Sequence, residues 1–403
     1  MSGTTHLYRP GGPYSWDRLH RTGLVKFRQF GPVVREDLLP GVTVLHLFSQ
    51  EDIKKVFLEE GAHPSRRSHT ALLQLRAGQP SLYNSGGLLP TNGPQWARNR
   101  FVLLWTIRTE STLDRNSLRR PVMSATSASH FIPSLEELML DVVSYISDNI
   151  DLLSGRDFLP ELEKIFVEAT GLITLDTRLE ALKTDLDPES LPARIIEAGS
   201  KVNSNVLETD SSLWFKIGRF EKRAFRETRE GLECLQEIAR TFLNSKIYSK
   251  EEEEEEEGTE DKTLVDSWLS SRDLDINDVA TAVEDFLLAG VHTVAYAVSF
   301  MMFHLATNRE VQARLREECR EVLALTGGQI TRKTIAAASL ASAVMKESLR
   351  LNPVAAATGR LLSKDSVFSG YNVPRGTVIV AHTQVASRLE HHFPHPESFK
   401  PER

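Results

Sequence analysis

The chain has 403 residues, 40% of them hydrophobic and 26% charged, a composition typical of a globular protein with a large core. Its formal charge of -7 is local, because removing the seven acids of residues 251–257 from the 55 acidic residues leaves 48, which equals the number of lysines and arginines. This balance gives no support for a nucleic-acid-binding protein. Two cysteines without metal-ligand spacing favour a reducing compartment.

The first half of the chain predicts a small β-rich region followed by helices. Residues 1–60 form the β-rich start, in which residues 31–49 are expected to give two strands around a turn, and residues 51–61 a short helix. Between residues 133 and 247 apolar side chains recur with helical spacing. The acidic residues 251–260 are expected to form a solvated surface loop.

The C-terminal part predicts further helices and a second set of strands. Asp275 or Asn277 can cap a long helix that runs through Thr307. Residues 339–353 predict another helix, which ends where a proline disfavours helical geometry in the residue before it. Residues 367–383 alternate like a strand pair around a turn at residues 370–376.

One apolar segment raises the question of a membrane. Residues 286–308 contain no Asp, Glu, Lys or Arg and are long enough to span a bilayer. Two histidines, a glycine and several hydroxyl groups favour a buried core helix instead. Residues 1–16 have neither a cationic start with an apolar core nor an arginine-rich amphipathic presequence, so the protein is not imported or its address lies outside this chain.

Three short motifs carry the functional information. Residues 289–293, AGVHT, place polar groups in the apolar helix. Glu347 and Arg350 of KESLR lie one helical turn apart, where they can pair. Such a pair alone indicates no more than a surface ion pair, but here a third motif, FKPER, follows and ends at Arg403.

In order and spacing these motifs resemble the cytochrome P450 family, the haem-thiolate monooxygenases. Residues 289–293 match its central helix, Glu347 and Arg350 its E-x-x-R motif, and the segment ending at Arg403 its meander. The resemblance implies that Glu347, Arg350 and Arg403 form a buried three-way salt bridge. Since a buried ion pair is weak evidence for stability, its expected role is to fix one geometry of the scaffold.

The resemblance also implies the fold and the cofactor. The chain is expected to be mainly α, a partial cytochrome P450 domain over residues 1–403 with a small β-rich lobe, lacking the C-terminal haem-ligand region. Haem b would be the cofactor and dioxygen a co-substrate. Trp96 and Arg100, in a W-x-x-x-R pattern, and Arg360 match positions that bind haem propionates, a task that suits the fixed donors of arginine.

Residues of the central helix receive catalytic roles by the same resemblance. Thr293 would distort the helix beside the iron and help to relay protons to bound dioxygen, and Ala289 and Gly290 would let the backbone approach the haem. His292 stands where the family usually has an acid, and an imidazole could still pass protons. The alternative for His292, and the expectation for His304, is a core side chain with satisfied hydrogen bonds.

Two features depart from the family pattern. The family's haem ligand is a cysteine in a glycine-rich loop after the meander, whereas Cys234 and Cys319 both precede the E-x-x-R helix. No metal ligand is therefore assigned, and the chain as given is expected to be inactive, because a thiolate is needed to favour O–O cleavage. Residues 101–116 have no family counterpart and suggest a non-family insertion, such as translated intron sequence.

Within the family the chain looks most like the mitochondrial branch, to which residues 17–42 and LDTRL at residues 175–179 are similar. This implies a location on the matrix side of the mitochondrial inner membrane, with a peripheral membrane contact. A small acidic ferredoxin would deliver electrons and dock at Lys346, although Ser342 leaves the basic patch incomplete. Residues 66–96 resemble the insect ecdysteroid hydroxylases, which implies a steroid or sterol-like substrate.

Other functions stay open at this point. A non-catalytic helical protein with the same fold but without haem is compatible with the missing cysteine. A membrane-spanning helical protein built around residues 286–308 is a second possibility. Within the enzymes, a haem-thiolate isomerase or dehydratase needs no oxygen activation, and the presence of Thr293 favours the monooxygenase.

Overall fold

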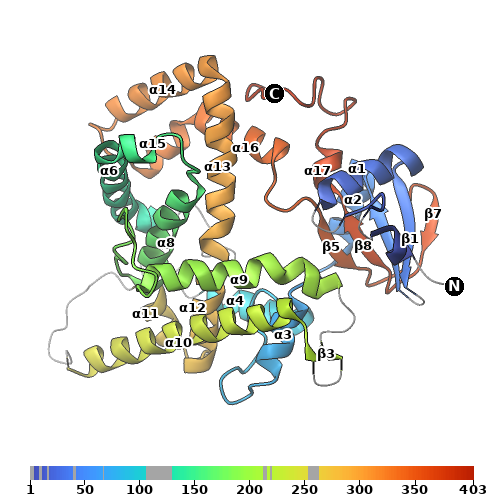
Figure 1. Ribbon diagram of the computed structural model, residues 1–403, viewed down its shortest axis with the longest axis horizontal. Coiled ribbons are helices and arrows are strands. Elements are labelled where there is room, and N and C mark those ends of the chain that lie inside the picture. The colour runs from blue at the N-terminus through green and yellow to red at the C-terminus, as the bar shows by residue number, and fades with distance from the viewer. Residues whose placement is uncertain are drawn as a thin grey trace, which may run out of the picture.

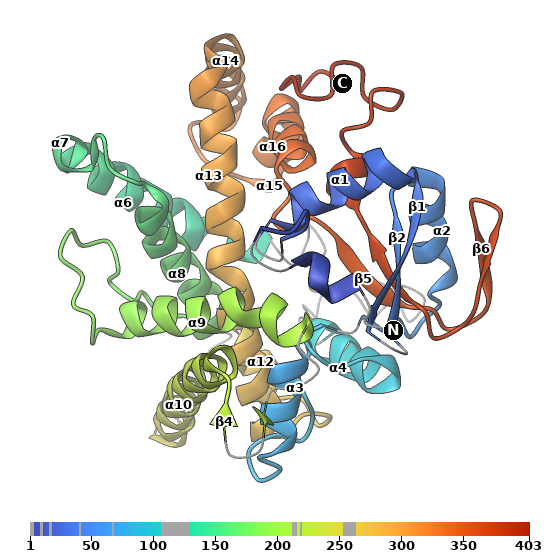
Figure 2. The same ribbon diagram turned by 45° about the vertical axis from the view of Figure 1, so that its right-hand side comes forward.

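The computed structural model describes residues 4–8, 11–15, 18–39, 42–66, 68–105, 129–211, 216–217, 220–252 and 263–403. Helices dominate the described chain, and a lobe that carries the sheet lies beside them (Figures 1 and 2). The predicted mainly α fold with a small β-rich lobe is confirmed.

The helices are η1 (Thr4–Tyr8), α1 (Leu19–Phe30), α2 (Gln50–Glu59), α3 (Thr70–Ala77), α4 (Gly93–Trp105), η2 (Ser129–Phe131), α6 (Ile132–Asp148), α7 (Ile150–Leu153), α8 (Leu159–Leu175), α9 (Leu191–Ser211), α10 (Arg223–Glu252), α11 (Leu264–Leu269), α12 (Ile276–Gly290), α13 (His292–Thr307), α14 (Arg309–Ala324), α15 (Arg332–Ala337), α16 (Ser339–Leu351) and α17 (Thr383–Ala386). The strands are β1 (Val33–Leu39), β2 (Val42–Leu47), β3 (Lys216–Ile217), β4 (Phe220–Glu221), β5 (Thr358–Leu361), β6 (Ser366–Phe368), β7 (Tyr371–Val373) and β8 (Val378–Ala381).

The sheet of the β-rich lobe joins the two ends of the chain. Its strand order is β1-β2-β8-β5, with β2 parallel to β8 and the other two pairs antiparallel. The predicted strand pair in residues 367–383 takes another form, because the chain turns at Ser369 and Gly370, where φ is positive, and β6 pairs with β7. Strand β8 then pairs with the N-terminal strand β2, which no local pattern could indicate.

The expected regions can be placed in this fold. Residues 1–60 contribute β1 and β2 but also the helices α1 and α2. Of residues 101–116, the first five continue α4, where Leu103 is buried and accepts a hydrogen bond from Trp268 Nε1 at 3.1 Å, and residues 106–116 lie outside the described residues. Of the acidic residues 251–260, two end α10 and the other eight lie outside the described residues.

The long apolar helix forms as predicted but is interrupted. Asp275 caps it in a reciprocal capping box with Asp278, and the break falls at Val291, between α12 and α13. By length and composition Ile276–Thr307 could cross a membrane. However, seven consecutive residues of α12, 279–285, are buried, so this half is surrounded on all sides within the protein. The core-helix interpretation is therefore favoured.

A buried polar network holds the β-rich lobe together. Lys26 of α1 donates to Glu36 of β1 and lies 3.1 Å from His46 Nε2 on β2. His46 Nδ1 lies 2.9 Å from Nε2 of His382, which stacks on Phe48 with 4.5 Å between ring centroids. Burial lowers the pKa of His382 to about 2, and the charge of Lys26 acts in the same direction.

This network predicts a pH-dependent stability. An unfolded chain protonates His382 near pH 6.5, whereas the folded protein does not until near pH 2, so folding stability is complete above pH 6.5 and falls as the pH drops. Each pH unit in this window should cost about 1.4 kcal/mol. Denaturant titrations at pH 7 and pH 5 measure the loss of unfolding free energy over this range. The loss should be about 2 kcal/mol smaller for His382→Gln than for the unmodified protein. Equal pH dependence of the two proteins would contradict this account.

Candidate functional site

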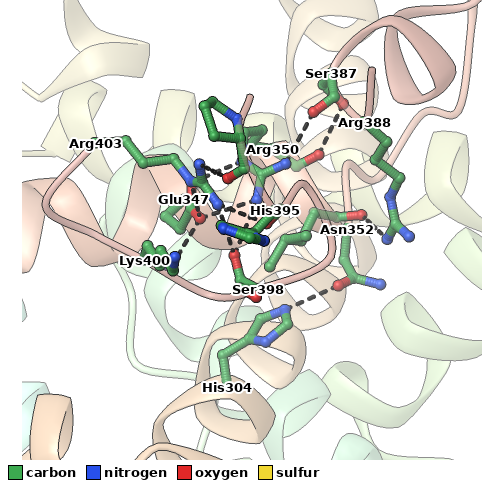
Figure 3. A network of polar contacts seen from close by, with 12 residues as sticks. His304, Glu347, Arg350, Asn352, Ser387, Arg388, His395, Ser398, Lys400 and Arg403 are labelled. Carbon is green, nitrogen blue, oxygen red and sulfur yellow. Dashed lines mark hydrogen bonds and ion pairs between the residues drawn. The ribbon is translucent and has the colours of Figure 1, made fainter. Parts of the chain in front are cut away.

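Glu347 of α16 is the centre of the ion-pair network in Figure 3. Its Oε2 accepts from Arg350 Nε at 2.7 Å, and its Oε1 accepts from Arg403 Nε at 3.1 Å and from the backbone N–H of Lys400 at 2.9 Å. Burial alone would raise the pKa of Glu347, but Arg350, the Lys400 N–H and Arg403 together hold it below its usual range. The carboxylate is therefore ionised at neutral pH.

The two arginines extend this network into the segment that follows β8. Arg350 Nη1 donates to the Ser387 carbonyl at 2.8 Å, and Arg403 Nη1 donates to the Pro394 carbonyl at 2.6 Å. Backbone that lacks regular structure is thus fixed to α16 by charged donors. Nearby, His304 bonds Asn352 at 2.9 Å and stacks on Phe399, which fits its expected core role (Figure 3).

Thr293 lies on an open face of the central helix. Its hydroxyl donates to the Ala289 carbonyl at 2.6 Å, one turn earlier and next to the helix break at Val291. Thr293, Val294 and Tyr296 are exposed, whereas Val291, His292 and Ala295 are buried. The described fold therefore leaves Ala289 and Thr293 free to line a ligand site.

Gly290 serves a different contact from the one expected. A Cβ atom at this position would lie 2.6 Å from Oγ1 and 2.8 Å from Cγ2 of Thr170, on α8. The glycine therefore allows α8 to pack closely against the central helix, and the close approach is between two helices. The expected approach of the Gly290 backbone to a haem receives no support from this contact.

His292 points into the helical core. Its Nδ1 lies 3.0 Å from Glu163 Oε1 on α8, and its Nε2 lies 2.9 Å from the Ile196 carbonyl on α9. The side chain is 4% exposed, and Gly199 leaves room for the ring. Of the two interpretations left open by the sequence, this geometry supports the satisfied core residue over the proton relay. Figures 1 and 2 show α9 crossing this junction of α12 and α13.

Trp96 and Arg100 come together on α4 with an arginine that the sequence did not indicate. The guanidinium carbons of Arg100 and Arg66 each lie 5.0 Å from the centroid of the Trp96 ring. Arg360, by contrast, pairs with Glu60 and lies 5.0 Å from the centroid of the Phe57 ring.

These side chains fit the carboxylates of a haem. Burial lowers the pKa of Arg66, and the nearby charges of Arg360 and Arg100 lower it further against the opposing charges of Asp285 and Glu60, so Arg66 lies within electrostatic reach of both arginines. Arginines in this arrangement suit anionic carboxylates, for which their fork of donors is well shaped. In the sequence, only the Arg66-Arg67 pair before an apolar helix could have indicated this additional arginine.

The remaining expected residues lie apart from this site. Lys346 is exposed on α16. Cys234 is half-buried on α10, with its sulfur 3.8 Å from Arg194, and Cys319 is exposed on α14. Among the described residues no group of three or more His, Cys, Asp or Glu side chains could hold a metal ion.

The Gly290 contact generates a test of helix packing. Gly290→Ala should destabilise the protein by about 1–3 kcal/mol, because the added methyl group overlaps Thr170. Thr170→Ala in the same chain should recover much of this loss, and unfolding curves of the four proteins in a double-mutant cycle measure the coupling. Additive effects of the two substitutions would show that the contact is not what requires glycine.

Comparison with known proteins identifies the family of the chain. The sequence profile of the cytochrome P450 family matches residues 14–403. The chain is 35% identical over its whole length to mitochondrial cytochrome P450 302a1 of Drosophila melanogaster and covers 77% of that protein. It is 23% identical to ecdysone 20-monooxygenase of the same fly, over 97% of this chain and 70% of that one.

A further relative and a solved structure agree on family and fold. Mitochondrial cholesterol side-chain cleavage enzyme of Oncorhynchus mykiss is 26% identical over 100% of this chain and 74% of its own length. The solved structure of retinoic-acid-bound cyanobacterial CYP120A1 matches with a TM-score of 0.68 at 15% identity, over 94% of this chain and 76% of that one, which shows a shared fold. The resemblance found in the sequence is confirmed, and the chain belongs to the cytochrome P450 family of monooxygenases.

Proposed function

We propose that this protein is a mitochondrial haem-thiolate monooxygenase that hydroxylates a steroid or sterol-like substrate, with electrons from a ferredoxin. The names of its relatives support the substrate class, since they include an ecdysone 20-monooxygenase and a cholesterol side-chain cleavage enzyme. Several of these relatives are named as mitochondrial, which supports the location. A role in ecdysteroid hormone biosynthesis is the most specific form of this proposal.

One observation of the structure supports the oxygen chemistry most directly. The exposed Thr293 hydroxyl lies at the helix break and donates to the Ala289 carbonyl, whereas the neighbouring His292 is buried. A hydroxyl at an interrupted helix can exchange its backbone acceptor for a ligand or a water molecule. We infer that Thr293 holds and passes a proton at its Oγ1 atom.

The other residues of the site bind and orient. Bound haem b would supply dioxygen activation and insertion of one oxygen atom into a C–H bond. Trp96, Arg100 and Arg66 are proposed to hold its propionate carboxylates, and Ala289 would line the haem site. Arg360, which pairs with Glu60 through its Nε, is proposed to join them.

The scaffold and the partner surface complete the proposal. Glu347, Arg350 and Arg403 fix the segment after β8, and residues 1–403 form part of one cytochrome P450 domain. Lys346 is exposed on α16 between the exposed Met345 and the buried Glu347, where an acidic ferredoxin could dock. A peripheral contact with the matrix side of the inner membrane is part of the same proposal.

The haem is tested by its spectrum. The protein translated from the complete transcript should purify with haem and, after reduction under carbon monoxide, show the Soret band of a haem–thiolate complex. A double substitution of Arg66 and Arg100 by Leu should weaken haem retention about 10-fold or more, because two charge-assisted contacts are lost. A folded protein that retains no haem would support the alternative, a non-catalytic protein with this fold.

The role of Thr293 is tested by coupling of electrons to product. Thr293→Ala should lower product formed per electron pair consumed by roughly 10-fold or more, because a positioned proton donor is lost. Thr293→Ser keeps the hydroxyl and should remain close to the unmodified enzyme. An equal loss in both variants would assign Thr293 a packing role.

A further inference from the structure

A buried ion cluster joins α3 to the central helix, apart from the residues assigned above. Arg76 of α3 donates to Asp285 Oδ1 at 2.8 Å and to Glu284 Oε2 at 3.1 Å, both on α12. The three side chains are at most 3% exposed. The Tyr83 hydroxyl also donates to Glu284, at 3.0 Å. Burying one cation with two carboxylates is costly, and this cost is offset only if the groups make further good hydrogen bonds.

The cluster forms hydrogen bonds with the backbone of the loop at residues 85–91. The second carboxylate oxygen of Asp285 accepts from the backbone N–H groups of Leu88 and Leu89, at 2.5 and 3.3 Å. Arg76 Nη1 donates to the Gly86 carbonyl at 2.8 Å. Gly87 has a φ of +80°, and a Cβ atom there would lie 2.6 Å from Asp285 Oδ2, so the loop is pressed against the cluster without space for a side chain.

The opposite side of the same loop is bonded to the residues that surround Trp96. Asn99 of α4 is buried and donates from Nδ2 to Ser85 Oγ at 3.0 Å and to the Gly87 carbonyl at 3.4 Å. Arg66 Nη2 donates to the carbonyls of Leu88 and Thr91, at 3.0 and 2.7 Å. The loop is therefore fixed on one side to α12 and on the other to α4 and Arg66.

We propose that Asp285 and Arg76 are positioning residues for the cofactor site. Asp285 lies four residues before Ala289, so it holds the loop one helical turn from the open face that carries Ala289 and Thr293. The position of the loop in turn determines the positions of Trp96 and Arg100 relative to that face. This inference rests on the proposed function, because it takes Trp96 and Arg100 as ligands of the haem carboxylates.

The net charge of the cluster depends on the protonation of Glu284. Burial raises the pKa of Glu284 to about 7, against the opposing effect of Arg76. Protonation of Glu284 would relieve the excess negative charge of two carboxylates around one arginine.

The experiment compares Asp285→Asn with Asp141→Asn, a matched control. Asp141 also pairs with an arginine, Arg178, but on the surface between α6 and the loop after α8. Measurements on the protein without haem are hydrogen exchange of peptides covering residues 85–91 and 96–100. In Asp285→Asn we expect exchange in both peptides to be about 10-fold faster or more, because a buried charged acceptor of two N–H groups is lost. The control should be unchanged.

Haemin binding, followed by the Soret band, gives the second readout. Asp285→Asn should raise the haemin dissociation constant about 10-fold, and Asp141→Asn should leave it unchanged. A folded Asp285→Asn protein with unchanged exchange in residues 96–100, or with unchanged haemin affinity, would overturn the positioning role. If the unmodified protein translated from the complete transcript binds no haemin, the proposed function fails, and the exchange at residues 96–100 still decides whether Asp285 positions α4.

Asn99→Ala removes the hydrogen bonds between the loop and α4 and leaves the ion cluster intact, so it tests the two sides of the loop separately. It should weaken haemin binding several-fold and speed exchange at residues 96–100, while exchange at Leu88 and Leu89 stays slow. Fast exchange at Leu88 and Leu89 in this variant would mean that the loop is held from α4 rather than from Asp285, which would contradict the proposal. This variant also serves if Asp285→Asn does not fold.

Discussion

The interruption of the central helix at Val291 is the constraint on which the site depends. Nearby residues on either side of it contact different neighbours. Gly290 packs against Thr170 of α8, and His292 forms hydrogen bonds with Glu163 of α8 and the backbone of α9. Because these contacts fix the rotation of the helix about its axis, Ala289 and Thr293 must face the opposite side. The position of the reactive hydroxyl thus follows from contacts on the far side of the helix.

Buried charges fix the parts of the chain that lack regular structure. Apolar packing is non-directional, whereas an arginine or a carboxylate holds named backbone groups at defined distances. Glu347 does this for the segment after β8, and Asp285 for residues 85–91. The motif LDTRL is explained in the same way. Buried Glu168 accepts from the Leu179 N–H at 3.0 Å and from Arg178, which also reaches Asp141 on α6.

Local sequence predicted what depends on local contacts. The cap at Asp275, the helix of the E-x-x-R motif and the mainly α fold were all predictable, because periodicity and capping act over a few residues. The pairing of β2 with β8, the partner of Gly290 and the direction of His292 were not, since each depends on a segment far away in the chain. The contact between Arg76 and Asp285 was not predictable either, because the two residues are far apart in the chain. The pair of adjacent acids in an apolar helix could, however, have indicated a buried polar contact.

The central claim is that contacts with α8 and α9 sort the residues of this helix into a core side and a cofactor side. A crystal structure of the haem-loaded protein tests it most directly. The account predicts the Thr293 hydroxyl facing the haem, with His292 still within hydrogen-bond distance of Glu163 and the Ile196 carbonyl. A His292 ring turned onto the haem side, with its bond to Glu163 broken, would contradict it.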